Sequence, residues 1–335
     1  MSNINTDVLI VGAGPSGLVM AIELGRRGVS CLVIDEKIKI AEVLKANATQ
    51  ARTMEYFRKM GVADSIKKQG LPSDYPTDVS YHTRFNSYEL ARVVLPAAND
   101  VDELIRMSRG AWPSPEMPHR CNQMYVEQVL QDKVAENSSS RVMLSWKLLA
   151  FKDGGDIVRA SIKNRQTDEE VEVTAKYLVG CDGANSVVRK KLGINYEGVK
   201  DVDREFISGK MCAIRIQSKS LYKHLPRKKS WMYWSFNKDR RGVLVAVNGV
   251  DNFIYHTQLS AAEQEMGEIS TELAKSIFFE ALGEGCDVQI TDSTFWHAGY
   301  TLVAERYGEG RVLIVGDAVH LFTPSGGLGY NTAVE

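Results

Sequence analysis

The stretch from Val8 to Gly17 constrains the fold more than any other part of the chain. It opens with four apolar residues, Val8 to Val11, and continues into a turn that contains three glycines. An uninterrupted apolar run is typical of a strand buried on both faces, and the apolar residues that follow the turn at helical spacing, Leu18, Ala21 and Ile22, predict a helix. The segment is therefore expected to form a strand, a tight turn and a helix.

Each glycine of this turn has a physical task. Gly12 permits the sharp change of direction, Gly14 allows the backbone to approach a pyrophosphate, and Gly17 allows the helix to pack closely on the strand. Pro15 and Ser16 complete the turn at the helix N-terminus, where free N–H groups and the helix dipole favour a phosphate. The turn predicts a dinucleotide-binding site.

A second apolar run, Cys31 to Ile34, ends at Asp35, which lies 18 residues after Gly17 and is followed by Glu36. A carboxylate at this distance accepts hydrogen bonds from the hydroxyls of an adenosine ribose. The alternative is an ordinary turn between a strand and a helix in an α/β fold. The strand before, the helix after and the acid at this spacing together favour the nucleotide site.

The composition excludes several classes of protein. The 41 basic and 42 acidic residues give a net charge of −1, which gives no support to a nucleic-acid partner. Five cysteines without CxxC spacing indicate free thiols in a reducing compartment and no metal site. The N-terminal residues lack the basic and apolar segments of a leader, and no apolar run reaches the ~18 residues of a membrane span. We therefore expect a cytoplasmic protein without a membrane partner, built as two subdomains or as one large α/β unit.

Two helices are expected to bring basic and polar side chains near this turn. One begins at Thr49 and contains Arg52, with Lys45 just before it, and the other begins near Asn122 and contains Gln123. Arg120 precedes the second helix. These side chains are candidates for phosphate or nicotinamide contacts, although solvated surface cations explain Lys45 and Arg52 equally well.

Two further strands end in glycine turns. The first runs from Tyr177 to Gly180 and is followed by Asp182 and Gly183, for which an Asx turn into a helix is the structural alternative. The second runs from Arg311 to Val315 and is followed by Gly316 and Asp317. Between the opening unit and these turns, an antiparallel meander is predicted at 146–151, 157–162 and 171–175.

An antiparallel sheet is predicted between the last two turns, with strands at 211–216, 231–236, 243–247 and 253–257. Alternation places Trp231, Tyr233 and Ser235 on one face and Met232, Trp234 and Phe236 on the other. One face is expected to line a pocket, with core packing as the alternative for each aromatic residue. His82 and His256 are candidates for a proton relay or for structural roles.

In this order, the three strand-end turns resemble the fingerprints of class A flavoprotein monooxygenases, in particular the phenol and para-hydroxybenzoate hydroxylase group. The resemblance extends over nearly the whole chain. It implies an α/β fold with a Rossmann-like FAD-binding domain that includes the meander, and an antiparallel-sheet substrate domain. The FAD-binding domain is expected at 1–72, 112–195 and 298–335, and the substrate domain at 73–111 and 196–297.

The resemblance also implies roles for individual residues. Pro324 would lie beside the flavin ring and Tyr233 would contact substrate, while Lys45 stands where the family commonly has arginine. The residues expected to contact FAD are Gly12, Gly14, Pro15, Ser16, Gly17, Asp35, Glu36, Lys45, Arg52, Arg120, Gln123, Asp182, Gly183, Gly316, Asp317, Pro324, Gly327, Gly329, Tyr330 and Asn331. For Tyr330 and Asn331 the contact is through backbone N–H groups at the flavin N1/O2 edge.

Enzymes of this group reduce FAD with NADPH or NADH, form a C4a-hydroperoxide with O2 and hydroxylate a phenolic or related aromatic ring. The resemblance implies the same reaction here, with a homodimer left open. The alternatives are a non-catalytic or truncated FAD-binding protein, and a flavin reductase or halogenase of the same fold. Since family members continue beyond Glu335, a C-terminal continuation is expected to be missing.

Overall fold

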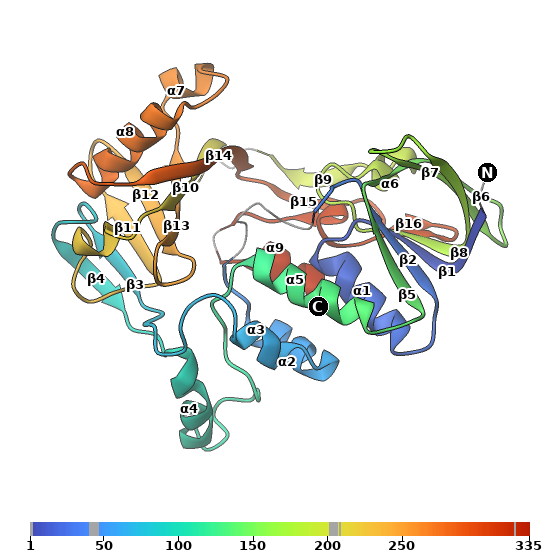
Figure 1. The fold of residues 1–335 in the computed structure, drawn as a ribbon, viewed down its shortest axis with the longest axis horizontal. Helices are drawn as coiled ribbons and strands as arrows, with labels where there is room; N and C mark the ends of the chain where they lie inside the picture. Colours follow the sequence, from blue (N-terminus) through green and yellow to red (C-terminus); the bar gives the residue numbers. More distant parts are fainter. Residues whose placement is uncertain (1–2, 40–46, 201–206, 208, 325) are drawn as a thin grey trace.

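The computed structural model describes residues 3–39, 47–200, 207, 209–324 and 326–335, and Lys45 lies outside them. The described residues form an eight-stranded, a seven-stranded and a three-stranded sheet. The two larger sheets lie at opposite ends of the molecule, and α1, α5 and α9 are grouped beside the eight-stranded sheet (Figure 1). The α/β class with a second, antiparallel sheet is confirmed.

The eight-stranded sheet is parallel at its centre, in the order β17-β8-β1-β2-β5. Its strands are β1 (Asn3–Val11), β2 (Cys31–Asp35), β5 (Ser140–Leu144), β6 (Trp146–Asp153), β7 (Val158–Asn164), β8 (Glu170–Gly180), β16 (Gly308–Glu309) and β17 (Val312–Ile314). The apolar run at the end of β1 is buried, as expected for a central strand covered on both faces.

Several helices share a hydrophobic core with this sheet. They are α1 (Pro15–Gly25), α2 (Ala51–Met60), α3 (Ala63–Lys67), α5 (Gln123–Ala135) and α9 (Leu328–Val334). The predicted helix from Thr49 is confirmed as α2, whose Met54, Phe57 and Met60 are buried. It ends at Gly61, where φ is +76°, because glycine adopts the left-handed conformation of a C-terminal cap without strain.

The predicted meander is confirmed, with one difference. The two separate strands expected at 171–175 and 177–180 are a single strand, β8. It pairs antiparallel with β7 and parallel with both β1 and β17. Its apolar side chains continue across the polar residues that suggested a break, so one strand connects the meander to the sheet centre.

The second sheet is largely antiparallel, in the order β14-β10-β13-β12-β11-β3-β4, with β3 parallel to β11. Its strands are β3 (Val79–His82), β4 (Glu89–Val93), β10 (Gly209–Gln217), β11 (Met232–Phe236), β12 (Arg241–Ala246), β13 (Asn252–Gln258) and β14 (Gln289–Ala298). The helix α8 (Thr271–Leu282) packs on one face, and α7 (Ala261–Glu265) precedes it.

The third sheet connects the two larger ones and was not predicted. It contains β9 (Tyr196–Val199), β15 (Thr301–Ala304) and β18 (His320–Leu321). Because β9 pairs with β15, it is hydrogen-bonded across the boundary expected at residue 298, and the domain boundaries stay a prediction. The remaining elements are α6 (Val187–Lys191), η1 (Ala98–Asp100), η2 (Leu221–Lys223), η3 (Gly316–Ala318) and α4 (Val101–Met107).

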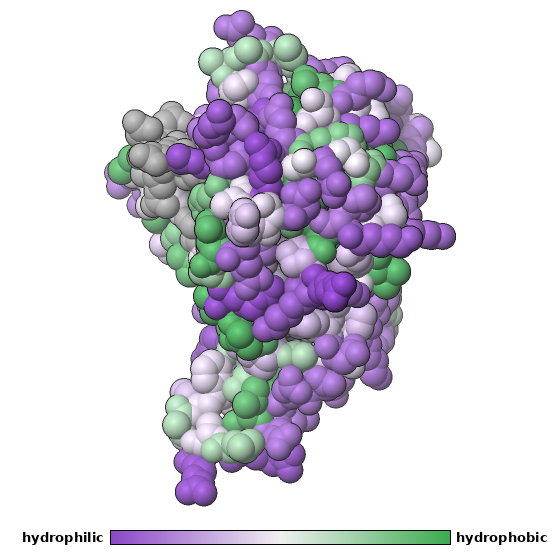
Figure 2. Space-filling view, turned by 90° about the vertical axis from the view of Figure 1, so that its left-hand side faces the viewer, coloured by the Kyte–Doolittle hydropathy of each residue, from purple (hydrophilic) through white to green (hydrophobic). Residues whose placement is uncertain are grey.

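The segment around α4 projects from the body of the molecule as the lower lobe in Figure 2. No residue of α4 is buried, and Leu104 and Met107 are exposed. Apart from this lobe, the apolar surface in that view is scattered among polar side chains. Among the described residues, every helix is too short or too polar to cross a lipid bilayer.

Candidate functional site

The three glycine turns meet at one edge of the eight-stranded sheet. Val11 pairs with Gly180, and Gly180 pairs with Ile314, so β1, β8 and β17 end side by side. All three are parallel, and their carboxyl ends therefore point to the same edge, where nucleotides bind in open α/β sheets. The turns after them begin at Gly12, Asp182 and Gly316.

The glycines of the first turn differ in what surrounds them. A Cβ atom at Gly12, where φ is +111°, would lie 2.3 Å from the carbonyl oxygen of Cys181, and one at Gly17 would lie 2.0 Å from the carbonyl oxygen of Gly12. A Cβ at Gly14 would meet no atom of the described residues within 4 Å. Gly12 and Gly17 thus serve close packing, whereas Gly14 borders open space at the start of α1.

This open space is lined by hydrogen-bond donors. Gly14 is the N-terminal cap of α1, and Pro15 and Ser16 follow in its first turn. The amides of a first helical turn lack partners within the helix and are available to an anion. The geometry therefore suits the pyrophosphate group predicted from the sequence.

Asp35 is held at the end of β2 beside the same turn. Its carboxylate accepts hydrogen bonds from the backbone N–H groups of Ala13, at 2.8 Å, and Lys37, at 2.9 Å. Two carboxylate oxygens have acceptor capacity beyond these two bonds. Glu36 is exposed, and its carboxylate lies 3.9 Å from a guanidinium nitrogen of Arg165. Ribose contacts for either acid stay a prediction.

The carboxylate of Asp182 caps a helix. It accepts hydrogen bonds from the Ser186 hydroxyl and from the backbone N–H groups of Val187, at 2.6 Å, and Val188, at 3.1 Å. Gly183 supplies the left-handed turn, with φ of +79°. The capped strand-to-helix connection is therefore present, and direct cofactor contacts of Asp182 and Gly183 stay predictions.

The third turn lies against the first. A Cβ at Gly316, where φ is +64°, would lie 2.5 Å from the Ser16 hydroxyl oxygen. Asp317 follows in η3 with an exposed side chain, and its carbonyl oxygen accepts a hydrogen bond from the Tyr196 hydroxyl. Asp317 thus lies one residue from the contact between the first and third turns, and its contact with the ribityl side of FAD stays a prediction.

The glycine-rich loop leads into α9. Gly327, with φ of +62°, is its N-terminal cap, and Asn331 is buried within it. The Asn331 side chain accepts from the Gln50 N–H at 2.7 Å and from the Thr53 hydroxyl at 2.8 Å, and it donates to the carbonyls of Ala48 and Gly327. This side chain fastens the loop to the start of α2, a function that the sequence reasoning missed.

Three more residues of this segment, Pro324, Gly329 and Tyr330, are predicted to contact FAD. Pro324 is exposed, and Gly329 and Tyr330 are half-buried. Burial raises the pKa of the Tyr330 hydroxyl. Their flavin contacts stay predictions.

Arg120 stacks on a residue that immediately precedes β11 of the second sheet. Its guanidinium carbon lies 4.4 Å from the centre of the Trp231 ring, and its buried Nε has no hydrogen-bond partner among the described residues. Burial lowers its pKa to about 10. No carboxylate of the described residues pairs with it, and a buried cation is costly unless an anion or a hydrogen-bond acceptor compensates it, so Arg120 fits a ligand contact.

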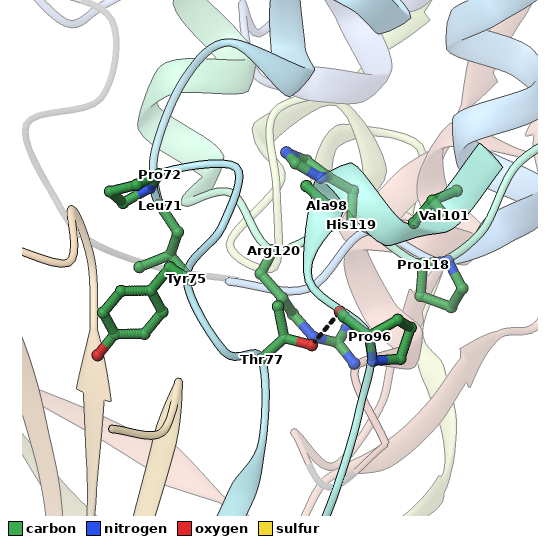
Figure 3. A pocket seen from close by; sticks show the side chains of 10 residues that line it. All are labelled: Leu71, Pro72, Tyr75, Thr77, Pro96, Ala98, Val101, Pro118, His119 and Arg120. Carbon is green, nitrogen blue, oxygen red and sulfur yellow. Dashed lines mark hydrogen bonds between the residues drawn. The ribbon is translucent and has the colours of Figure 1, made fainter. Parts of the chain in front are cut away.

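Arg120 also lines a small cavity with Leu71, Tyr75, Thr77 and His119 (Figure 3). The volume of about 10 Å³ is close to the space that one water molecule needs. The Nε2 atom of His119 is buried and has no hydrogen-bond partner within the described part of the chain. Burial, reinforced by the charges of Lys67 and Arg120, lowers the His119 pKa to about 4.

Gln123 and Arg52 have partners on their own helices. The Gln123 amide donates to the Glu127 carboxylate at 2.6 Å, and both side chains are buried. Arg52 is exposed and pairs with Glu55 at 2.6 Å. A phosphate contact of Arg52 would require this pair to rearrange, and the contacts proposed for both residues stay predictions.

The position of Tyr233 agrees with core packing, which is the alternative to a substrate contact. Its predicted face is confirmed, because Trp231, Tyr233 and Ser235 are all buried. That face packs with residues of α8, such as Phe278, and the Tyr233 hydroxyl accepts a hydrogen bond from the Ser230 N–H at 2.8 Å. This burial favours core packing, and a substrate contact of Tyr233 stays a prediction.

The opposite face of the second sheet meets the helices of the first. Val247 and Ile254 form a cluster with Met124 and Tyr125 of α5. His256 lies two residues after Ile254 on that face, and burial lowers its pKa to about 4. The alternation of residues along the strands predicted two separate faces, but it did not predict which face the helix α8 would cover.

Taken together, the described residues fit FAD. Open space adjoins Gly14, the first-turn amides of α1 face it, and Arg120 holds an unpartnered buried nitrogen beyond it. A family model described as "FAD binding domain" matches residues 5–335. The chain belongs to this FAD binding domain family.

The chain is also similar to several curated proteins. Aklavinone 12-hydroxylase DnrF of Streptomyces peucetius is 30% identical over 340 residues, covering 98% of this chain and 65% of that protein. A putative polyketide hydroxylase of Streptomyces halstedii is 28% identical, with 98% and 57% covered. The 2,4-dichlorophenol 6-monooxygenase of Delftia acidovorans is 26% identical, with 99% and 56% covered. The chain thus spans about half to two thirds of the length of these relatives.

Solved structures with a similar fold include two flavin-dependent proteins. The flavin-dependent monooxygenase PieE, in complex with FAD and substrate, matches with a TM-score of 0.85 at 26% identity, covering 100% of this chain and 56% of that one. The rebeccamycin biosynthetic enzyme RebC with reduced flavin matches with a TM-score of 0.84 at 27% identity, covering 99% and 60%.

Proposed function

We propose that this chain is the FAD-binding and substrate-sheet portion of a monooxygenase that hydroxylates an aromatic ring of the phenol or polyketide class. The convergence of three glycine turns at one sheet edge carries the proposal, because it provides a place for both ends of FAD. The names of the relatives support the hydroxylase activity. The proposal also includes NADPH or NADH as the reductant and oxygen transfer at the flavin ring.

The chain's own residues are assigned binding and positioning roles. Amides of the first turn of α1 bind the pyrophosphate, Asp35 binds the ribose and Asp317 binds the ribityl side. FAD, when bound, supplies the electron transfer from NAD(P)H and the activation of O2. The apolar contacts of Ile254 and Val247 with α5 keep water out of the junction between the two larger sheets, which protects such chemistry.

Pro324 is assigned to the rim of this junction. It is exposed in the loop that precedes α9. A proline has no N–H group, and its fixed φ angle gives a rigid wall beside a planar ring. A homodimer stays part of the proposal without a specific contact behind it.

The test begins with the purified chain. We expect a visible flavin spectrum after reconstitution with FAD, and NAD(P)H oxidation that a phenolic or polyketide compound accelerates. Product analysis should show one added oxygen atom. In the full-length protein, binding of FAD without any acceleration or hydroxylated product, across a panel of such compounds, would refute the hydroxylase and leave a flavin-binding protein.

Asp317→Ala tests the assignment of the third turn. The side chain is exposed, and the variant should lose most of its bound FAD, because a charge-assisted hydrogen bond to the cofactor is removed. Its melting temperature without FAD, measured beside the wild-type chain, shows whether the fold is kept. Asp239→Ala, an exposed acid at the far end of the second sheet, is the matched control. Full FAD occupancy in Asp317→Ala would refute the assignment.

A further inference from the structure

The second and third glycine turns are joined by a pair of side chains outside either turn. These are Arg189 of α6 and Tyr196 of β9. The Arg189 guanidinium carbon lies 3.7 Å from the centre of the Tyr196 ring. An arginine at this distance over an aromatic face is held by cation–π attraction and by stacking.

Arg189 is anchored to the second turn. Its Nη1 donates to the carbonyl of Ala184 at 3.0 Å, and the side chain is buried. The helix that contains it is capped by Asp182 and by Ser186, whose hydroxyl accepts from the Arg189 N–H at 2.9 Å. The Asp182 carboxylate therefore determines where the guanidinium lies.

Tyr196 reaches the third turn. Its hydroxyl donates to the carbonyl of Asp317 and lies 3.4 Å from the carbonyl of Ala184. The neighbouring carbonyls of the third turn accept from backbone N–H groups, Gly316 from Val319 and Val319 from Ala304. The Asp317 carbonyl is thus held by a side chain from another strand, which orients the peptide that carries the Asp317 carboxylate.

We propose that Tyr196, supported by Arg189, is a positioning residue that fixes the Asp317 peptide and thereby the FAD affinity of the third turn. In this arrangement Asp182 acts on the cofactor through α6, Arg189 and Tyr196. Burial raises the pKa of the Tyr196 hydroxyl to about 12, which keeps it a hydrogen-bond donor at neutral pH. The inference rests on the proposed FAD site.

Tyr196→Phe is the direct test, because it keeps the ring under Arg189 and removes only the hydroxyl. A single hydrogen bond contributes about 1 kcal/mol, so the FAD dissociation constant should rise about fivefold in a flavin-fluorescence titration. Tyr177→Phe is the matched control, since Tyr177 also lies under an arginine, Arg311, but on β8 away from the turns. The control should bind FAD like the wild-type chain.

Hydrogen exchange of the chain without FAD provides a second readout. The amides of Val319 and Ala304 should exchange faster in Tyr196→Phe than in the wild-type chain, while amides of β10 and β13 stay unchanged. Wild-type FAD affinity in Tyr196→Phe, or unchanged exchange at Val319 and Ala304, would overturn the inference. If the wild-type chain binds no FAD, the proposed function fails, whereas the exchange experiment still decides whether Tyr196 holds the turn.

Discussion

The two larger sheets differ in whether backbone atoms or side chains determine their geometry. We call the edge of the eight-stranded sheet where the three glycine turns meet the cofactor edge. Its geometry depends on the backbone, since glycines at positions 12, 17 and 316 lie against neighbouring atoms that a Cβ would strike. The second sheet depends on side chains, with stacked aromatic rings and a buried ion-pair network. Backbone constraints require particular residues at fixed spacing and are therefore recognisable in the sequence. A packed interior accepts many combinations of side chains and is not.

The largest expected effect tests the second sheet. Arg240 is buried and donates to Glu263, at 2.6 and 3.0 Å, and to Glu280, at 2.9 Å. Arg240→Met leaves Glu263 without its counter-charge, which should cost about 3 to 5 kcal/mol of unfolding free energy in urea denaturation. Arg241→Met, at the exposed neighbouring position, is the control. Equal stability of the two variants would show that the network contributes nothing.

The next effect tests the cofactor edge. Gly17→Ala forces a Cβ into the Gly12 carbonyl and should reduce the unfolding free energy by about 3 kcal/mol. Gly14→Ala meets no atom within 4 Å, so it should keep its melting temperature without FAD and bind FAD about tenfold more weakly. If the two alanines had the same effect on stability, the division of tasks among the glycines would be wrong.

A pH experiment probes the junction between the two regions. The folded pKa of His119 is about 4, below its ordinary value of 6.5, so the unfolded chain binds more protons between these values. Stability should therefore fall on acidification, by about 2 kcal/mol between pH 7 and pH 5 for this residue. His256 has the same shift and adds to the loss.

His119→Gln should flatten this dependence in urea denaturation at the two pH values, leaving the contribution of His256. His297→Gln, at an exposed position of β14, is the control and should keep the wild-type dependence. A wild-type dependence in His119→Gln would contradict the role of the buried imidazole.

The smallest effect concerns the aromatic face of the second sheet. Tyr233→Phe removes the acceptor of the Ser230 N–H and should cost about 1 kcal/mol of stability. The KM for an aromatic substrate should stay unchanged, because the ring packs toward α8. A substrate KM raised severalfold at unchanged stability would instead restore Tyr233 as a substrate contact.

The cofactor turns were predictable because their chemistry is local in sequence. Gly12, Gly14 and Gly17 perform tasks that few other residues can, and the strand before them is apolar throughout. The alternation along β11 likewise predicted that Tyr233 and Trp231 share a face. These features follow from backbone geometry and a period of two.

The remaining features depend on contacts between distant segments. The sequence gives no spacing signal for the stacking of Arg189 on Tyr196, because the third sheet that presents Tyr196 consists of very short strands. From the sequence, Asp182 could belong to a phosphate-facing turn or to an Asx turn that begins a helix. The structure shows that its carboxylate caps α6, which depends on where α6 lies. Similarly, α8 could have covered either face of the second sheet.

The long strand β8 has a consequence for how the chain folds. Its partners β1 and β17 lie far before and far after it in the sequence, so the edge that receives the cofactor is completed only when residues near 12, 180 and 314 have come together. Such non-local pairing closes long loops and slows folding. During synthesis on the ribosome, β1 and β2 emerge well before β17, so the cofactor edge is among the last parts of the molecule to become competent.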